Sequence, residues 1–376
     1  MTQAATAPAP AQPPLGTGRA LKGLVLAGGK GSRLRPLTAT GAKQLVPVAN
    51  KPVLFYALEQ LVAAGIEEIG IVTGDTGAQV RAAVGDGGAF GARISYIPQT
   101  APLGLAHAII TAREWLGEAA FCLFLGDNFL KTGIVAHAVR FAHAEGCAAQ
   151  ILLKRVADPA AFGVAVLDGD GRVERLVEKP VAPISDLAVI GVYFFGPEIH
   201  AITPLLVPSA RGELEITDAI QGLVDAGLTV RASVIDDDWI DTGKKDDVLE
   251  ANRLVLGTLR RRIAGEVDAA STLVGEVVIE DGAVVVGSTV RGPAIVGAGA
   301  RLTDCYVGPF TAIGPRCELD RCEIEHSIVL EGSVIRDIAA RIADSLIGRE
   351  VVVERSPLKP QAVRLMLGDH SRVGLA

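Results

Sequence analysis

The sequence predicts two joined folds: an α/β fold with a mostly parallel sheet through roughly residue 240, and a parallel β-helix after about residue 265. Strand and helix patterns alternate through the first part, which is typical of a parallel sheet with crossover helices. In the second part an aliphatic residue recurs every six positions, which is the period of hexapeptide repeats. A chain of 376 residues also favours two domains over one.

Composition excludes several classes of partner. The net charge is −7, which argues against binding to nucleic acid or to an anionic membrane surface. No apolar run is long enough to span a bilayer. The five cysteines are odd in number and form no C-x-x-C, so a reducing compartment fits better than a disulfide framework or a zinc site. We therefore expect a cytoplasmic protein.

The chain begins with an expected disordered tail and a glycine loop. Residues 1–19 are rich in Ala and Pro and lack the features of a signal peptide. A predicted strand, Leu21–Ala27, then enters Gly28-Gly29-Lys30-Gly31-Ser32-Arg33. Backbone N–H groups of such a loop can cradle phosphates, and Arg33 adds a cation. The pattern is neither a G-x-G-x-x-G fingerprint nor a P-loop. Taken alone, the glycines fit an ordinary turn equally well.

Hydrophobic periodicity and turn residues predict the elements that follow. Thr217 and Asp218 are expected to cap a helix that begins at Ala219. The predicted helices are Val53–Ala63, Leu105–Leu116, Ala219–Ala226 and Lys244–Ile263. The predicted strands are Glu68–Val72, Arg93–Ile97, Ala120–Leu125, Ala149–Val156, the hairpin strands Val164–Leu167 and Val173–Val177, and Ala188–Phe195.

The six-residue period predicts the β-helix, in which each short strand turns one aliphatic side chain inward. The predicted inward residues are Val278, Val284, Val290, Val296 and Leu302, then Val307, Ile313 and Leu319, then Ile324 and Leu330. A valine-rich β-sandwich is the alternative, and the sustained period disfavours it. We expect a linker helix over 251–265, the β-helix over 266–355 and a tail over 356–376 that breaks the period.

Four charged residues stand in contexts that suit phosphate chemistry. Asp127 in LGDN and Asp241 in WIDTG follow predicted strands, at the edge where α/β sheets bind ligands. Two such carboxylates can hold Mg²⁺ against a polyphosphate, although each alone fits a turn or capping aspartate. Lys43 in AKQLVP and Lys179 in EKP could neutralise charge on a leaving group, although lone lysines are usually solvated.

Three further residues are candidate ligand contacts. Glu178 could accept hydrogen bonds from a sugar hydroxyl, or it could form a surface ion pair of little energy. Gln99 could pair with a base edge or simply end a strand, and Trp239 could line a pocket or belong to the core. Local sequence suggests no Ser-His-Asp or Cys-His arrangement, so a covalent mechanism is not indicated.

As an ordered set, the motifs resemble those of the sugar-1-phosphate nucleotidylyltransferases, most closely the long-form glucose-1-phosphate thymidylyltransferases. The resemblance implies a Rossmann-like nucleotidyltransferase catalytic domain over residues 20–250, followed by a left-handed parallel β-helix of hexapeptide repeats. The motifs that carry it are LAGGKGSRLRPLT at 26–38, AKQLVPVANKPVLFY at 42–56, YIPQTAPLGLAHAI at 96–109, LGDN at 125–128, FGV at 162–164, EKP at 178–180, GELEITDAI at 212–220 and WIDTG at 239–243.

The resemblance implies a reaction and a role for each motif residue. The phosphate of glucose 1-phosphate would attack the α-phosphorus of dTTP in line, with Arg33, Lys43 and Lys179 as catalytic residues. Asp127 and Asp241 would hold Mg²⁺. The nucleotide would be bound by Leu26, Ala27, Gly28, Gly29, Gly31, Ser32, Gln99, Gly104 and Leu105. The sugar phosphate would be bound by Asn128, Gly163, Glu178, Val189 and Trp239.

Several alternatives stay open on the sequence. Gln44 after Lys43 favours dTTP, but UTP, ATP or GTP with another sugar or cyclitol phosphate is possible. Phe162 stands where short-form relatives resemble YGV, which removes a hydroxyl near the sugar. A silent scaffold subunit is a further alternative, against which the intact charged residues argue. An acetyltransferase activity of the β-helix is another, although His326 is the only histidine within the repeats. We expect a homo-oligomer, because β-helices often mediate assembly.

Overall fold

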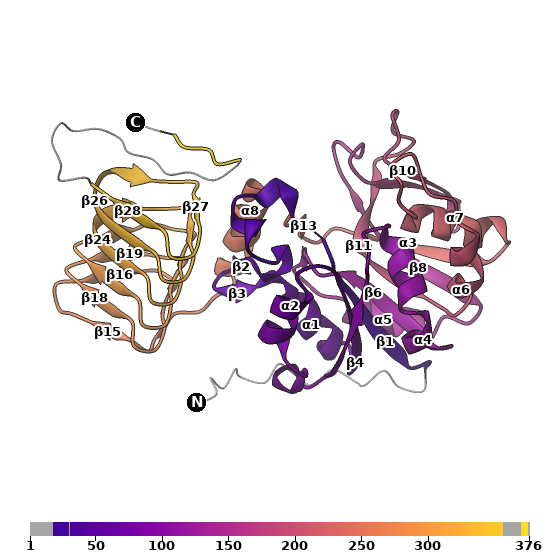
Figure 1. Cartoon of the computed structure of the whole chain (residues 1–376), viewed down its shortest axis with the longest axis horizontal. Helices are drawn as coiled ribbons and strands as arrows, with labels where there is room; N and C mark the ends of the chain where they lie inside the picture. Colours follow the sequence, from indigo (N-terminus) through magenta and orange to yellow (C-terminus); the bar gives the residue numbers. More distant parts are fainter. Residues whose placement is uncertain (1–17, 30, 356–369, 375–376) are drawn as a thin grey trace.

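The computed structural model describes residues 18–29, 31–355 and 370–374, so most of both expected tails lies outside the described residues. Figure 1 shows an α/β part joined to a parallel β-helix, which confirms the predicted fold class. Arg19, expected within the disordered tail, is instead anchored. Its guanidinium donates to the carbonyl oxygens of Phe141 (3.1 Å), Ala144 (3.1 Å) and Cys147 (3.0 Å). Phe141 lies in the last turn of helix α5 (Val135–Ala142), and Ala144 and Cys147 follow it, where backbone acceptors lack helical partners.

Strand β1 (Leu21–Ala27) lies at the centre of the main sheet. It pairs in parallel with β4 (Glu68–Thr73) and β6 (Ala120–Leu125), and β4 pairs in parallel with β5 (Arg93–Pro98). These bounds agree with the predicted strands to within one residue, and β1 and β6 are nearly continuous apolar runs. Leu26 of β1 pairs with Leu125 of β6, so the glycine loop and Gly126-Asp127 leave the sheet at the same edge.

Antiparallel strands extend the sheet on one side. Strand β11 (Leu187–Phe195) pairs with β6, with β8 (Cys147–Arg155) and with β9 (Gly163–Leu167), and β9 forms the predicted hairpin with β10 (Val173–Glu178). The remaining strands of the α/β part are β2 (Pro47–Val48), β3 (Lys51–Pro52), β7 (Asn128–Leu130), β12 (Thr229–Ile235) and β13 (Trp239–Asp241). Its helices with predicted counterparts are α1 (Val53–Ala63), α3 (Leu105–Thr111), α4 (Arg113–Leu116), α7 (Ile216–Asp225) and α8 (Lys245–Leu256). The others are η1 (Ser32–Leu34), η2 (Leu37–Ala39), η3 (Lys43–Leu45), α2 (Gly77–Val84), η4 (Gly88–Phe90), α6 (Ile199–Ile202) and η5 (Thr203–Leu205).

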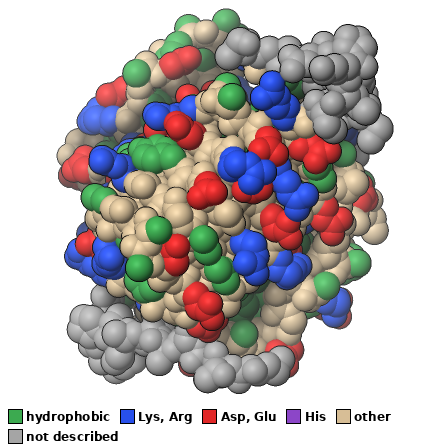
Figure 2. All heavy atoms as spheres, turned by 90° about the vertical axis from the view of Figure 1, so that its left-hand side faces the viewer, with side chains coloured by type: hydrophobic (Ala, Val, Ile, Leu, Met, Phe, Trp, Pro, Cys, Tyr) green, Lys and Arg blue, Asp and Glu red, His purple; other side chains and the backbone are tan. Residues whose placement is uncertain are grey.

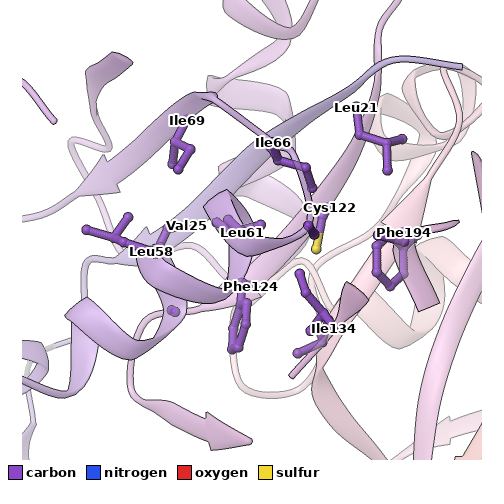
Figure 3. Close-up of a cluster of buried hydrophobic side chains, with 14 of the residues drawn as sticks. Leu21, Val25, Leu58, Leu61, Ile66, Ile69, Cys122, Phe124, Ile134 and Phe194 are labelled. Carbon is purple, nitrogen blue, oxygen red and sulfur yellow. The ribbon is translucent and has the colours of Figure 1, made fainter. Parts of the chain in front are cut away.

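One apolar core fills the space between helix α1 and this sheet. Figure 3 shows Leu58 and Leu61 of α1 among residues of β1, β4 and β6 such as Val25, Ile69 and Phe124. All five side chains are fully buried. Truncating one of these leucines to alanine would cost about 2–5 kcal/mol, since a packed core closes only partly over a cavity. This rigid layer holds the carboxyl ends of β1 and β6 in place.

Three predicted helices need correction. Helix α7 begins at Ile216, three residues before the predicted start, and Glu215 is at its N-cap. Thr217, a predicted capping residue, lies inside the helix, and its hydroxyl donates to Glu178. The helix predicted over Leu105–Leu116 is divided into α3 and α4 at Ala112. Helix α8 ends at Leu256, so the expected linker helix over 251–265 stops early. Arg262 and Ile263 form strand β14, because pairing with β17 extends the first coil of the β-helix.

The β-helix is built from parallel strands stacked coil on coil. In the middle coils, partner residues lie 17 apart, as in Val278 with Ile295 and Ile295 with Ala312. One face is a sheet of β14 (Arg262–Ile263), β17 (Val277–Ile279), β20 (Ala294–Val296), β23 (Thr311–Ile313), β25 (Ile328–Val329) and β27 (Leu346–Ile347). The other strands are β15 (Glu266–Val267), β16 (Thr272–Val274), β18 (Val284–Val286), β19 (Thr289–Arg291), β21 (Arg301–Thr303), β22 (Tyr306–Val307), β24 (Glu318–Ile324), β26 (Val334–Ile342) and β28 (Val352–Glu354).

Seven of the ten predicted inward residues lie inside the coil: Val290, Val296, Leu302, Val307, Ile313, Leu319 and Ile324. The other three do not. Val278 and Leu330 face the α/β part instead, and Val284 is partly exposed while its neighbour Val285 is buried. Where valines are consecutive, either neighbour can be the inward residue of the six-residue period. A coil of 17 residues is also one residue shorter than three hexapeptides, so the period shifts by one position in such a coil.

The outer face of the β-helix carries charges of both signs. Figure 2 shows acidic and basic side chains interspersed over this end of the molecule. Several form ladders between coils, as in Arg321 with Asp337 (2.7 Å) and Arg341 with Glu323 (2.9 Å). Exposed pairs of this kind contribute about 0–1 kcal/mol each. Within the described residues, no helix is long and apolar enough to cross a membrane.

Candidate active site

A two-stranded ribbon brings the two predicted aspartates together. Strands β7 and β13 pair antiparallel, with Asn128 opposite Asp241, so Asp127 lies directly beside the end of β13. Thr242 strengthens the junction, because its backbone N–H (3.0 Å) and its hydroxyl (2.7 Å) both donate to the Asp127 carbonyl oxygen. Residues 114 positions apart in the chain are therefore held at one edge of the sheet.

Two cationic side chains, Lys43 and Arg33, lie close to these carboxylates. The Lys43 ammonium donates to Asp127 Oδ2 and lies 3.7 Å from Asp241 Oδ1. Arg33 Nη2 lies 3.9 Å from Asp241 Oδ2. The Lys43 side chain is only 9% exposed, whereas that of Arg33 is 59% exposed and free to meet a ligand. The structure thus places four predicted site residues in one cluster of two positive and two negative groups.

The surroundings of the Asp241 carboxyl group shift its pKa. Burial first, and then the nearby Asp127 carboxylate, raise the pKa of Asp241, while Lys43 and Arg33 oppose the rise. Its Oδ1 atom is buried and accepts no hydrogen bond from any residue that the structure describes. A buried carboxylate oxygen without a donor is a suitable ligand for a hard cation.

The glycine loop begins where β1 ends. Gly31 has φ of 61°, and an added Cβ there would lie 2.8 Å from Lys43 Cβ, so a larger residue would displace that lysine. The Thr38 hydroxyl donates to the Gly31 carbonyl oxygen (2.5 Å) and closes the loop behind it. Ser32 begins the 3₁₀ turn η1, which presents Arg33. Leu26 and Ala27 contribute buried positions at the end of β1.

The segment around Gln99 lies against the start of this loop. An added Cβ at Gly28 would lie 3.6 Å from Gln99 Oε1, which places the amide over the first glycine. The Gln99 amide also donates to the Gly104 carbonyl oxygen (3.4 Å) and lies 2.8 Å from His107 Nδ1. Gly104 has φ of 107° and packs against the backbone of Leu214, where a Cβ has no room. An added Cβ at Gly29 would lie 3.4 Å from Gln44 Nε2.

A cavity of about 190 Å³ opens beside the aspartates. Its lining includes seven of the predicted residues together with Asp241: Leu105, Asn128, Gly163, Glu178, Lys179, Val189 and Trp239. Among the described residues, Gln99 and the loop glycines do not line it. Asp241 belongs to both the charge cluster and the cavity lining, and so marks the junction between the two halves of the site.

Asn128 is fixed on the cavity wall by two neighbours. Trp239 Nε1 donates to Asn128 Oδ1 (2.6 Å), and Asn128 Nδ2 donates to Asp127 Oδ1 (3.1 Å). Gly191 leaves the necessary room, since an added Cβ would lie 2.5 Å from Asn128 Oδ1. The rings of Phe162 and Trp239 pack edge to face, with their centroids 5.5 Å apart. Phe162, which lacks the hydroxyl of the tyrosine in the YGV motif, therefore contributes aromatic packing at this position.

The opposite wall contains charged residues that received no individual role from the sequence. Arg211 Nη2 donates to Glu178 Oε1 (3.2 Å) and to Glu215 Oε2 (2.7 Å). Thr217 Oγ1 donates to Glu178 Oε2 (3.3 Å). Burial raises the pKa of Glu178, while Lys179 lowers it and Glu215 adds to the rise. The motif GELEITDAI contains Glu215 and Thr217 and could have indicated this wall. The sequence does not show, however, that this motif lies against the EKP motif, which contains Glu178.

Comparison with known proteins identifies the family of the chain. The family model described as nucleotidyl transferase matches residues 22–257. A glucose-1-phosphate thymidylyltransferase from Streptomyces griseus is 54% identical over 356 residues, covering 95% of this chain and 100% of that protein. One from Streptomyces antibioticus is 53% identical over 353 residues, covering 94% of this chain and 99% of that protein.

A solved structure extends the likeness to three dimensions. UDP-glucose pyrophosphorylase complexed with UDP-glucose superposes with a TM-score of 0.58 at 26% identity, covering 63% of this chain and 99% of that one. That share is about the size of the α/β part, whereas the two Streptomyces relatives match 95% and 94% of the chain. On these matches, together with the ordered motifs, the chain belongs to the nucleotidyl transferase family.

Proposed function

We propose that the protein transfers a thymidylyl group from dTTP to glucose 1-phosphate, giving dTDP-glucose and pyrophosphate. The observation that carries the proposal is the convergence of Arg33, Lys43, Asp127 and Asp241 at the mouth of a cavity lined by Glu178 and Lys179. The relatives from Streptomyces, named as glucose-1-phosphate thymidylyltransferases, support the same substrates.

In this proposal the sugar phosphate occupies the cavity. Glu178 and Asn128 offer polar atoms for sugar hydroxyls, and Lys179 meets the phosphate. A phosphate oxygen of glucose 1-phosphate forms a new bond to the α-phosphorus of dTTP. The bond from the α-phosphorus to the bridging oxygen breaks, and pyrophosphate leaves with that oxygen. No side chain is bonded to the substrate, so catalysis consists of positioning and charge stabilisation.

The nucleotide lies along the glycine loop in the same proposal. Backbone N–H groups around Gly28, Gly29 and Gly31 approach the phosphates, while Leu26, Ala27, Ser32 and Leu105 complete the pocket walls. Arg33 is exposed enough to reach the triphosphate and the leaving pyrophosphate. The buried Lys43 ammonium adds a second positive charge beside it. Gln99 and Gly104 contact the base, as their mutual hydrogen bond beside Gly28 allows.

The carboxylate pair fits a divalent cation. Asp127 and Asp241 supply hard oxygen donors, and Asp241 Oδ1 has no hydrogen-bond donor among the described residues. Two carboxylates suffice for Mg²⁺, since it keeps several waters and phosphate oxygens as its other ligands. When bound, Mg²⁺ would neutralise phosphate charge as pyrophosphate departs.

The test is a pyrophosphate-release assay over a grid of nucleoside triphosphates and sugar 1-phosphates with Mg²⁺. We expect dTTP with glucose 1-phosphate to give the highest kcat/KM. Faster turnover with UTP would refute the thymidylyl assignment. UTP is included because the structural relative described above is complexed with UDP-glucose. Turnover of no pair would refute the enzymatic function and favour a scaffold role. We further propose a cytoplasmic homo-oligomer, which light scattering and fractionation would test.

A further inference from the structure

The β-helix packs directly against the segments that carry the charge cluster. A single buried apolar cluster joins the two parts of the chain. From the α/β part it includes Leu34, which follows Arg33, together with Val46, Val48, Val248 and Leu249. From the β-helix it includes the outward-facing Val278, Ile295, Ala312, Ile328 and Leu330. Figure 1 shows β2, β3 and α8 on the side of the α/β part that faces the β-helix.

A tight hairpin turn belongs to this interface. Strands β2 and β3 are joined by Ala49 and Asn50 alone, and their φ angles are 47° and 64°. A two-residue turn of this kind requires positive φ at both positions. Asparagine tolerates that conformation, but alanine rarely adopts it, because its Cβ approaches the neighbouring carbonyl oxygen. Ala49 is therefore held in a strained conformation by its surroundings.

Two asparagine amides hold the turn against one coil of the β-helix. The Ala49 N–H donates to Asn252 Oδ1 (2.9 Å), and Asn252 Nδ2 donates to the Phe310 carbonyl oxygen (3.0 Å). Asn50 Nδ2 donates to the Ile313 carbonyl oxygen (2.8 Å). The Asn252 side chain is fully buried. Fully satisfied polar groups inside an apolar interface make it directional, so the turn has one docked position. We call this arrangement the asparagine clamp.

Hydrogen bonds to backbone carbonyl groups connect the asparagine clamp to Lys43. The Val46 N–H donates to the Lys43 carbonyl oxygen (3.1 Å), and the Val53 N–H donates to the Val46 carbonyl oxygen (3.1 Å). The Tyr56 hydroxyl donates to the Val48 carbonyl oxygen (2.8 Å). These three hydrogen bonds tie the segment from Lys43 to the turn to itself and to α1, so a displacement of the turn strains the backbone at Lys43.

We infer that the β-helix positions Lys43 for catalysis through the asparagine clamp, with Asn50 and Asn252 as positioning residues. The inference rests on the proposed function, in which Lys43 supports the leaving pyrophosphate. Loss of the clamp lets the strained turn relax and moves the Lys43 ammonium relative to Asp127. In this chain the α/β part then depends on the β-helix, which holds one of the cations of the site in place.

The test compares three full-length variants. Asn252→Leu removes both hydrogen bonds of Asn252 while it preserves apolar packing. Asn50→Gly removes the contact to Ile313 yet suits the positive φ, so this variant is expected to fold. Val285→Ala is the matched control: Val285 is fully buried inside the coil and belongs to no contact with the clamp. It lowers the thermal midpoint without touching the turn.

The kinetic expectation separates positioning from stability. Asn252→Leu should lower kcat by about tenfold to a hundredfold, since a shift near 1 Å has effects of this size. The KM for glucose 1-phosphate should change by less than about threefold, as expected for an interaction of the transition state alone. Asn50→Gly should lower kcat in the same direction, and Val285→Ala should not. Unchanged kcat in both clamp variants overturns the inference.

Hydrogen exchange supplies a readout that does not need turnover. The amides of Val46 and Ala49 should exchange faster in both clamp variants than in Val285→Ala and in the wild type. Equal exchange in all three variants overturns the inference, and so does faster exchange with unchanged kcat. If the wild type turns over no substrate pair, the proposed function fails, and the exchange comparison alone then decides whether the clamp holds the Lys43 segment.

Discussion

Replacing Lys43 by methionine is the sharpest test of the charge cluster, because it removes one charge and preserves length. The Lys43 ammonium is paired with Asp127 and lies 3.7 Å from Asp241 Oδ1. Without it, the nearest cation that the structure describes is Arg33 Nη2, 3.9 Å from Asp241 Oδ2. Removing one partner of a buried ion pair costs about 3–5 kcal/mol. The Asp127 and Asp241 side chains are 17% and 33% exposed, so water screens part of the uncompensated charge and we expect the lower end, about 3 kcal/mol.

This loss converts into a measurable change in melting temperature. Unfolding entropy near 2 cal/mol/K per residue gives a decrease of about 4 °C, if the chain unfolds as one unit. A divalent cation should restore the stability of Lys43→Met, since it can neutralise both carboxylates. At about a hundredfold excess over its dissociation constant, Mg²⁺ would stabilise the fold by about 2.7 kcal/mol. The wild type should gain less, because Lys43 competes for Asp127.

The assay is thermal unfolding of both proteins in EDTA and in excess Mg²⁺. Adding Asp127→Asn to the Lys43→Met background is the control, and it should remove most of the Mg²⁺ effect. If Mg²⁺ leaves the melting temperature of Lys43→Met unchanged, the two aspartates are not a cation site. If Lys43→Met is as stable as the wild type in EDTA, Lys43 does not neutralise the pair, and the reasoning about the cluster is wrong.

Two further predictions use carboxylates and a buried histidine. Asp127→Asn and Asp241→Asn should each lower kcat by about 10²–10³-fold in the pyrophosphate assay, with an unchanged circular dichroism spectrum; near-normal rates in both would remove the metal role. Burial lowers the pKa of His200 from 6.5 to about 4, and neither ring nitrogen has a hydrogen-bond partner among the described residues. The unfolded chain therefore binds more protons below pH 6.5, and His200 should reduce the free energy of unfolding as the pH falls from 6.5 towards 4, by about 2 kcal/mol at pH 5. Urea midpoints of the wild type and His200→Leu at pH 7 and pH 5 check this, and equal pH dependence would contradict it.

Elements that depend on local pattern were predicted well. Strands β1 and β6 and helix α1 have the predicted bounds, because an apolar run or a helical period between turn residues is itself the physical cause of the element. The prediction of helix α8 was wrong at its end. Arginines at 260–262 favour a helix locally, but pairing of β14 with β17 is a contact between distant residues that local propensity cannot report.

The same division applies to the candidate site. Arg33, Lys43, Asp127 and Asp241 could be identified by their motifs, and the structure brings all four together. Arg211 received no role, because its ion pairs with Glu178 and Glu215 depend on how the loop before α7 meets β10. In the β-helix, runs of valine left the phase ambiguous, and only packing against α8 decided that Val278 faces outward.

The sequence by itself determined the fold class, the positions of most strands of the main sheet and the chemical types at the site, since these follow from periodicity and residue identity. The tertiary structure alone decided which charges neutralise each other, which wall completes the cavity and how the β-helix holds the Lys43 segment. The physical reason is that burial and hydrogen bonding between residues far apart in the chain, such as Asn252 with Ala49 and Phe310, exist only after the two parts have packed.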